Sequence, residues 1–266
     1  PCEFVHKEFW DGVNFRRGAN PPRERWVAPP QKTPAESAVA WRNFEGYMRF
    51  IRGFDDVKFI TASEAAKLYH DRARGRSFSA EEINEIARTV TPEITFQQHG
   101  RKTLSPSEVF WLLNRYVIQV PRQPDGFVTL DTSPLGPTER GTSSSEKELT
   151  VDWSQFSRTA SDVDDFIKRH ERLPSTVWLG SQPASPESYL VALAAVVRQL
   201  TAANNPPPAV TLRQARLAAG KYVVDDQPGL WGWVIFPPGF HAPAMMELAR
   251  RQAWTIKPAV LAVRGK

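Results

Sequence analysis

The sequence predicts a helix-rich α+β protein that contains an internal duplication. Apolar residues recur at steps of three and four in several segments, which is typical of helices with one buried face. Short apolar runs bounded by proline and glycine lie between these segments and indicate brief strands. One helix–turn–helix pattern also returns 80 residues later in the chain. We therefore expect an α/β segment, then two duplicated helical modules, then a small C-terminal α/β segment.

Length and composition limit the possible classes of protein. The 266 residues favour one large domain or two modest ones, and 41% hydrophobic residues are enough for a packed core. The longest apolar run, 189–197, is far shorter than the roughly 20 residues of a membrane helix. The net charge of +5 comes from basic residues scattered among acids, which does not favour nucleic-acid binding. The single cysteine, Cys2, excludes an internal disulfide and a cysteine-based zinc site.

The first 70 residues combine a turn-rich start with an α/β pattern. Prolines prevent long helices in 1–34, yet apolar residues are dense there, so we expect this segment to pack on something. An amphipathic helix is predicted over 35–53 and a short strand over 57–60. A capping box over 61–64 opens a second helix that ends near residue 69. This order of helix, strand and helix is typical of an α/β unit.

The duplication is the most specific signal in the sequence. Ser105-Pro106 and Ser185-Pro186 each open a helix, because serine caps the first amides and proline needs no hydrogen bond there. Apolar residues follow at the same offsets in both copies, and the preceding helices carry Ile83 and Val163 at the same distance, 22 residues, before each Ser-Pro. Between the helices, 91–96 and 173–178 each predict a proline turn that leads into a short strand.

These patterns divide the chain into five predicted segments. An N-terminal segment covers 1–72, the first helical module covers 73–122, and a linker covers 123–150. The second module covers 151–203, and a C-terminal segment that packs on it covers 204–266. In the C-terminal segment we expect a helix from Thr211, a strand over 231–236, and a final helix from Pro243 to about Trp254.

No catalytic motif is visible in the sequence. The five histidines lack metal-ligand spacing, and neither a nucleophile elbow nor a phosphate-binding glycine loop occurs. The candidate sites are mixtures of aromatic and polar side chains, which suit sugar binding because a flat ring packs on C–H faces while polar groups bind hydroxyls. The candidate substrate-binding residues are Glu3, His6, Trp10, Asp11, Asn14, Trp231 and Trp233. The alternative interpretation is that these residues belong to buried loops and to the core.

The N-terminal strings resemble a known enzyme family. The stretch from Pro1 through the Phe-Trp-Asp-Gly-Val-Asn-Phe run of 9–15, and then Gly18-Ala-Asn-Pro-Pro22, is similar to the region after the last catalytic motif of bacterial NodB-homology polysaccharide deacetylases, carbohydrate esterase family four. Residues 41–70 are similar to the closing helix, strand and helix of that family's α/β barrel. The resemblance implies that 1–72 is the C-terminal remnant of a barrel edge.

The two helical modules resemble pseudomurein-binding repeats. Leu173-Pro-Ser-Thr-Val177 and the helix opened by Ser185 fit that pattern. The first copy departs from it, because Thr91-Pro-Glu-Ile94 replaces the Leu-Pro turn and three extra residues are expected around His99-Gly-Arg101.

Together the resemblances imply a metal-dependent hydrolase that removes N-acetyl groups from cell-wall or related glycans. In such an enzyme an Asp and two His hold zinc or another divalent metal, which polarises the amide carbonyl. Those groups would lie upstream of Pro1, so this chain is expected to carry no catalytic residue and no metal or other cofactor of its own. It would supply accessory, glycan-binding modules in an extracytoplasmic or cell-wall location.

Two alternatives remain open at this stage. The chain could be a complete, non-catalytic protein that binds cell-wall polysaccharide. It could also be a structural scaffold in which every aromatic residue belongs to the core and no glycan is bound.

Overall fold

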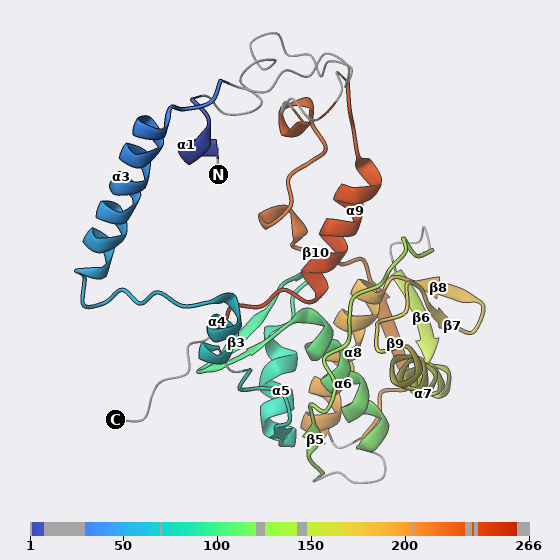
Figure 1. Ribbon diagram of the computed structural model, residues 1–266. Coiled ribbons are helices and arrows are strands. Elements are labelled where there is room, and N and C mark those ends of the chain that lie inside the picture. The colour runs from blue at the N-terminus through green and yellow to red at the C-terminus, as the bar shows by residue number, and fades with distance from the viewer. Residues whose placement is uncertain are drawn as a thin grey trace. The chain divides into compact units, whose positions relative to one another are not determined.

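The computed structural model describes residues 2–7, 30–69, 71–120, 126–142, 148–203, 205–231, 236 and 239–259 (Figure 1). The chain divides into two compact units. Unit 1 comprises Pro1–Lys67 with Asp225–Pro243, and unit 2 comprises Leu68–Val224 with Ala244–Lys266. Helices alternate with short strands that pair into five two-stranded sheets in the described part of the chain. The prediction of a helix-rich α+β protein is confirmed at this level.

Unit 1 contains a long helix that begins and ends where the sequence predicts. The short helix α1 covers Cys2–Val5, and α3 covers Pro34–Arg52. Thr33 caps α3 in a complete capping box with Glu36, and Pro34 occupies the first turn, where its missing N–H costs nothing. An isolated bridge between His6 and Gln31 holds the start of the chain beside the segment before α3.

The apolar side of α3 remains largely exposed. None of its residues is buried, and Tyr47 and Phe50 are 61% and 65% exposed. Phe4 of α1 stacks on Trp41 with ring centroids 4.1 Å apart and meets Phe44 edge-on. Within the described part of unit 1, α3 is therefore amphipathic by sequence but covered only at this one place.

The α/β pattern predicted for the rest of this segment is only half correct. Helix α4 covers Ala62–Leu68, and Thr61 and Glu64 form the predicted capping box. Residues 57–60 are described but form no strand, so that prediction is wrong. A strand needs a partner for its backbone groups, and none pairs with this run among the described residues. No closed barrel forms in the described part of the chain.

Unit 2 contains two successive halves with the same order of elements. Each half runs strand, helix, hairpin, helix, strand. The first half comprises β1 (Ser77–Phe78), α5 (Ala80–Thr89), the hairpin β3 (Gln97–His99) and β4 (Lys102–Leu104), α6 (Pro106–Gln119) and β5 (Val128–Thr129). The second comprises β6 (Glu148–Asp152), α7 (Trp153–His170), the hairpin β7 (Val177–Leu179) and β8 (Gln182–Ala184), α8 (Pro186–Ala203) and β9 (Ala209–Arg213). The outer strands pair antiparallel in both halves, β1 with β5 and β6 with β9.

The two hairpins have the same length and register. Gln97 pairs with Leu104 in one, and Val177 pairs with Ala184 in the other. Gly100 and Gly180 occupy the first turn position with φ of 62° and 65°, which a type II′ turn requires and which glycine adopts without strain. The expected three-residue insertion around His99-Gly-Arg101 is therefore wrong. The difference between the copies lies earlier, where the additional strand β2 (Glu93–Ile94) follows α5.

The helix starts follow the predicted serine caps. Ser79 and Ser105 form complete capping boxes with Glu82 and Glu108. In α8 the Ser185 hydroxyl accepts a bond from the Ser188 amide at 3.1 Å, without an acidic partner. The same local chemistry therefore opens the second helix of each half.

The two halves pack against each other through reciprocal pairs of helices. Helix α5 packs on α8, α6 packs on α7, and α6 and α8 contact each other. Strand β10 (Arg216–Leu217), which follows the second half, pairs parallel with β2 in the first. Leu135, which follows the first half, forms a parallel bridge with Arg172 in the second. The halves thus share one core, in which Phe110 and Phe156 both lie against Tyr189.

The C-terminal part departs from two predictions. The run from Thr211 forms β9 rather than a helix, because Val210 and Leu212 alternate inward and pair with β6. Trp231 ends the 3₁₀ helix η3 (Pro228–Trp231) of unit 1 instead of opening a strand, and 232–235 lie outside the described residues. The final helix is confirmed as α9 (Pro243–Arg251), followed by η4 (Gln252–Trp254).

The end of the described chain contacts the first half as well as the second. Trp254 is 1% exposed and meets Phe110 of α6 edge-on. Lys257 Nζ lies 2.8 Å from the Glu108 carboxylate, at the start of the same helix. The C-terminal segment therefore does not pack on the second module alone, as the sequence analysis expected.

Candidate functional site

Most of the sequence-predicted binding residues lie outside the described part of the chain. This holds for Trp10, Asp11, Asn14 and Trp233, and for the side chain of Glu3 in α1. Their role in binding stays a prediction. The structure describes the side chains of the other two, His6 and Trp231.

His6 lies in a bridge rather than in an open site. It pairs with Gln31, and the flanking bonds join the Lys7 amide to the Pro30 carbonyl and the Lys32 amide to the Val5 carbonyl. Its Nδ1 is buried without a hydrogen-bond partner among the described residues. One unpaired ring nitrogen does not by itself make a sugar site.

Trp231 is held by neighbours from unit 1. Its indole Nε1 donates to Asp226 at 2.5 Å, and Phe236 and Phe240 approach the ring edge-on at 5.1 and 5.2 Å. Asp226 also accepts a bond from the Ala242 amide. These contacts satisfy the indole N–H and pack two rings against the partly buried Trp231, which is typical of a packing residue.

The structure shows an aromatic surface that the sequence analysis did not select. Trp178 lies in the middle of β7 and is 55% exposed, whereas Val177 and Leu179 on either side are buried. Because side chains alternate across a strand, the indole points away from the shared core. Pro183 of β8 is its cross-strand partner and lies on the same outer face.

The backbone beneath Trp178 is anchored to α7. Thr159 Oγ1 donates to the Trp178 carbonyl at 3.0 Å, and Gln155 Nε2 donates to Thr159 Oγ1 at 3.3 Å. Arg158 in turn donates to Gln155 Oε1 at 3.2 Å. These hydrogen bonds fix the hairpin on α7. The polar side chains of Gln155 and Arg158 therefore lie on the same helix that anchors the backbone of Trp178. The site is therefore positioned by secondary structure rather than by a loop.

The sequence held a signal for this surface. Val177-Trp178-Leu179 is an apolar run between Pro174 and Gly180, which predicts a short strand but does not show which side chain points outward. The equivalent position in the first half, 80 residues earlier, is Gln98. The aromatic surface is thus a property of the second half only.

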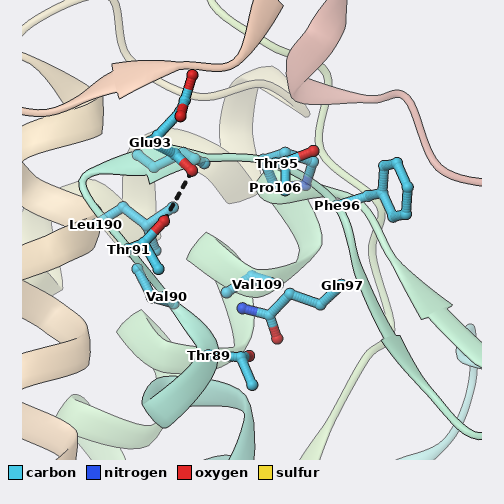
Figure 2. Close-up of a pocket in the computed structure, with 11 residues that line it drawn as sticks. Thr89, Val90, Thr91, Glu93, Thr95, Phe96, Gln97, Pro106, Val109 and Leu190 are labelled. Carbon is cyan, nitrogen blue, oxygen red and sulfur yellow. Dashed lines mark hydrogen bonds between the residues drawn. The ribbon is translucent and has the colours of Figure 1, made fainter. Parts of the chain in front are cut away.

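The cavity drawn in Figure 2 is too small for a sugar. It has a volume of about 30 Å³, and Thr89, Thr91 and Gln97 line it together with Val109 and Leu190. Thr91 Oγ1 donates to the Glu93 carbonyl at 2.9 Å within it (Figure 2). A water needs about 10–15 Å³ and ligand sites occupy about 300–1,000 Å³, so this cavity accommodates water at most.

Groups suited to metal binding do not gather in the described part of the chain. No cluster of three or more His, Cys, Asp or Glu side chains there has a geometry that would hold a metal ion. Within the same residues, no helix has both the length and the apolar character needed to cross a bilayer.

Comparison with known proteins adds no relative to this description. No protein-family model, curated protein or solved structure matches the chain.

Proposed function

We propose that unit 2 binds a cell-wall or other N-acetylated polysaccharide, with the Trp178 indole as its main contact. The main observation is a large aromatic ring, 55% exposed, on a strand whose flanking residues Val177 and Leu179 are buried. A flat ring of this kind can pack on the C–H face of a sugar, while neighbouring polar side chains bind hydroxyls.

Contrast with two other tryptophans of unit 2 supports this assignment. Trp111 and Trp254 are 2% and 1% exposed and lie in the shared core. Trp111 Nε1 donates to Asp131 at 3.1 Å, so its polar group is already paired. Exposing Trp178 gains nothing for folding, because an indole stabilises a protein by burial. A bound ligand that covers the ring would supply the burial that the fold does not provide.

The proposal includes the origin of the scaffold. We interpret the two halves as products of a duplication, related to pseudomurein-binding repeats. The shared order of elements, the equal hairpin registers and the 80-residue offset of Gly100 and Gly180 support this interpretation. Binding is assigned to the second half, because the first has Gln98 where the second has Trp178.

For unit 1 we propose a relationship to the edge of a polysaccharide-deacetylase barrel. The exposed aromatic side of α3 supports it, because a helix patterned in this way is expected to pack against a larger apolar surface. In this proposal the zinc or other divalent metal and the acid–base residues belong to the barrel itself and not to the described residues of unit 1. The accessory role then implies an extracytoplasmic or cell-wall location.

Retention on insoluble peptidoglycan tests the binding proposal. We expect Trp178→Ala to weaken retention about tenfold, the loss typical of a central aromatic contact. Phe127→Ala is the matched control, because Phe127 is 64% exposed elsewhere in unit 2 and should leave retention unchanged. Both variants should keep the wild-type unfolding midpoint.

Two results would overturn the proposal. Equal retention of Trp178→Ala and wild type would remove the indole from the site. Failure of the wild-type chain to bind peptidoglycan or chitin would favour a structural scaffold instead.

A further inference from the structure

The two halves of unit 2 differ in the length of their first helix. Helix α7 has 18 residues, whereas its counterpart α5 has 10. With the 80-residue offset between the halves, α5 corresponds to 160–169 of α7. The first two turns of α7, residues 153–159, therefore have no helical counterpart in the first half. This extension and Trp178 occur together, in the half to which binding is assigned.

The extension lies beside the hairpin that carries Trp178. Thr159 is 1% exposed, and its hydroxyl donates to the Trp178 carbonyl. One turn earlier, Gln155 reaches the tip of the hairpin, since a Cβ added at Gly180 would lie 3.6 Å from Gln155 Oε1. The hairpin thus runs along α7 from Gln155, which is level with its turn, to Thr159, which is level with Trp178.

Arg158 and Asp162 lie on the exposed border of this contact. Helical residues three and four apart are surface neighbours, so 155, 158, 159 and 162 form one patch. Within it Thr159 is buried against the hairpin, whereas Arg158 and Asp162 are exposed. The Trp178 indole also projects away from the core. The hairpin residues 177–184 include no charged side chain, so α7 supplies the charges at this border.

The Arg158 guanidinium is oriented but not neutralised. Its Nη2 donates to Gln155 Oε1 at 3.2 Å, and Gln155 is itself held by Thr159. In the described part of the chain no carboxylate pairs with Arg158, and this includes Asp162 one turn along the helix. A guanidinium has five N–H donors, so most of them remain available to a ligand. Prior orientation of the side chain lowers the entropy cost of binding.

A carboxylate is the ligand group that matches an oriented guanidinium. The two groups form parallel hydrogen bonds between opposite charges, which are stronger than bonds to a neutral hydroxyl. The exposed indole offers a flat face for the C–H groups of a sugar ring. A sugar that bears a carboxylate would use both contacts, whereas a neutral sugar would use only the indole fully.

We propose that Arg158 makes the Trp178 surface selective for an acidic sugar. The sugar ring packs on the indole, and the carboxylate of the same or the adjoining residue of the glycan pairs with the guanidinium. Asp162 opposes this binding through its like charge, so selectivity depends on the balance between the two α7 side chains. This inference rests on the proposed glycan binding and names the class of sugar that the site prefers.

Calorimetric titration of the full chain with matched probes tests the inference. The first probe is a hexamer of alternating N-acetylglucosamine and N-acetylmuramic acid, and the second is its methyl ester, which lacks the charge. We expect wild type to bind the acid about threefold to fivefold more tightly than the ester, the range of an exposed ion pair. A hexamer of alternating N-acetylglucosamine and glucuronic acid, compared with its own ester, distinguishes a carboxylate on the ring from one on an ether arm.

Variants of α7 assign the preference to Arg158. Arg158→Gln should bring the ratio of acid to ester affinity close to one, and Arg158→Lys should retain part of the preference because it keeps the charge. Asp162→Asn should increase the ratio, because it removes the opposing charge. Arg169→Gln is the matched control, since Arg169 is an exposed arginine in the last turn of the same helix, and it should leave the ratio unchanged.

Three results would overturn the inference. Equal affinity of wild type for acid and ester would show that the charge is not recognised. An unchanged ratio in Arg158→Gln, with both probes weakened alike, would reduce Arg158 to a structural role. An equal fall of the ratio in Arg158→Gln and Arg169→Gln would assign the preference to overall charge.

The outcomes also separate this inference from the proposed function. If Trp178→Ala weakens the binding of both probes while Arg158→Gln keeps the preference for the acid, the Trp178 surface stands and its selectivity for acidic sugars is wrong. If the acid binds through Arg158 while Trp178→Ala has no effect on either probe, the charge contact stands and the role of the indole is wrong.

Discussion

The two halves of unit 2 have the same backbone plan and different surfaces. Both consist of a helix, a hairpin turned by glycine and a second helix, enclosed by a pair of antiparallel strands. The second half exposes Trp178 on its hairpin, whereas the first has Gln98 there. The difference indicates that the core positions maintain the scaffold in both halves, while the outward positions are not constrained to be alike.

The largest expected effect tests the shared scaffold. Leu113 and Leu193 are equivalent positions of α6 and α8, and both are fully buried. We expect Leu113→Ala and Leu193→Ala each to lower the free energy of unfolding by about 2–5 kcal/mol, since each leaves a cavity in the common core. Urea unfolding followed by circular dichroism measures both. A cost below about 1 kcal/mol for one variant alone would show that the halves do not share one core.

A smaller effect on stability is expected at Asn114, a polar residue of the core that has no polar equivalent in the second half. Asn114 Nδ2 donates to the Ala160 carbonyl at 2.9 Å, and its Oδ1 accepts from the Tyr189 hydroxyl at 3.0 Å. The equivalent residue of the second half is Ala194. Asn114→Ala should lower the free energy of unfolding by about 1–3 kcal/mol, because it leaves the buried Tyr189 hydroxyl without its acceptor and removes a buried bond to the Ala160 carbonyl.

Tyr189→Phe is the control for this network. Once the hydroxyl is gone, Asn114→Ala leaves one polar group fewer unpaired, so the two losses should be less than additive. Strict additivity in the double variant would show that the Asn114–Tyr189 bond contributes nothing to stability.

The smallest expected effects concern two carboxyls, Glu82 and Glu187, whose surroundings shift their pKa values in opposite directions. In the first half, the bond from Lys102 leads the interactions that lower the pKa of Glu82 below 4.5. In the second half, burial raises the pKa of Glu187 above 4.5. Ionised Glu82 therefore stabilises the fold above its unfolded pKa, and this is lost as the pH falls through the folded value. Glu187 contributes most below its unfolded pKa, and this is lost as the pH rises through the raised value.

The corresponding glutamine variants should show opposite signs. At pH 7, Glu82→Gln should lower and Glu187→Gln should raise the free energy of unfolding, each by up to about 1 kcal/mol. For Glu187→Gln the difference from wild type should vanish below pH 4.5, where the native carboxyl is protonated as well. Thermal unfolding between pH 3 and 8 measures both. A change in the free energy of unfolding of the same sign for both variants at pH 7 would contradict the opposite pKa shifts of Glu82 and Glu187.

Local chemistry made the helices of this protein predictable from the sequence. The serine caps before α5, α6 and α8 and the threonine caps before α3 and α4 mark helix starts through side-chain bonds to nearby amides, so they need no tertiary information. The short strands depended on distant partners. The run 57–60 has strand-like residues but no partner among the described residues, while 209–213 becomes a strand because β6 pairs with it.

The candidate site was harder to predict because exposure is a tertiary property. Trp231 and Trp178 both lie in apolar runs of the sequence, yet Phe236 and Phe240 surround the first and the hairpin turns the second outward. The proposed site also combines Trp178 of β7 with Arg158 of α7, and no spacing in the sequence indicates that the two lie close together. Helix α3 shows the converse. Its apolar side was evident from the sequence, but the sequence does not show what packs against that side.

The most direct test of the account is a nuclear magnetic resonance titration of the ¹⁵N-labelled chain with soluble N-acetylglucosamine hexamer. Trp178→Phe assigns the Trp178 indole N–H signal. We expect a saturable shift of that signal, with smaller shifts at the backbone amides of β7 and β8 and none at the buried indoles of Trp111 and Trp254. An unmoved Trp178 signal at a concentration that shifts other residues of unit 2 would contradict the central claim.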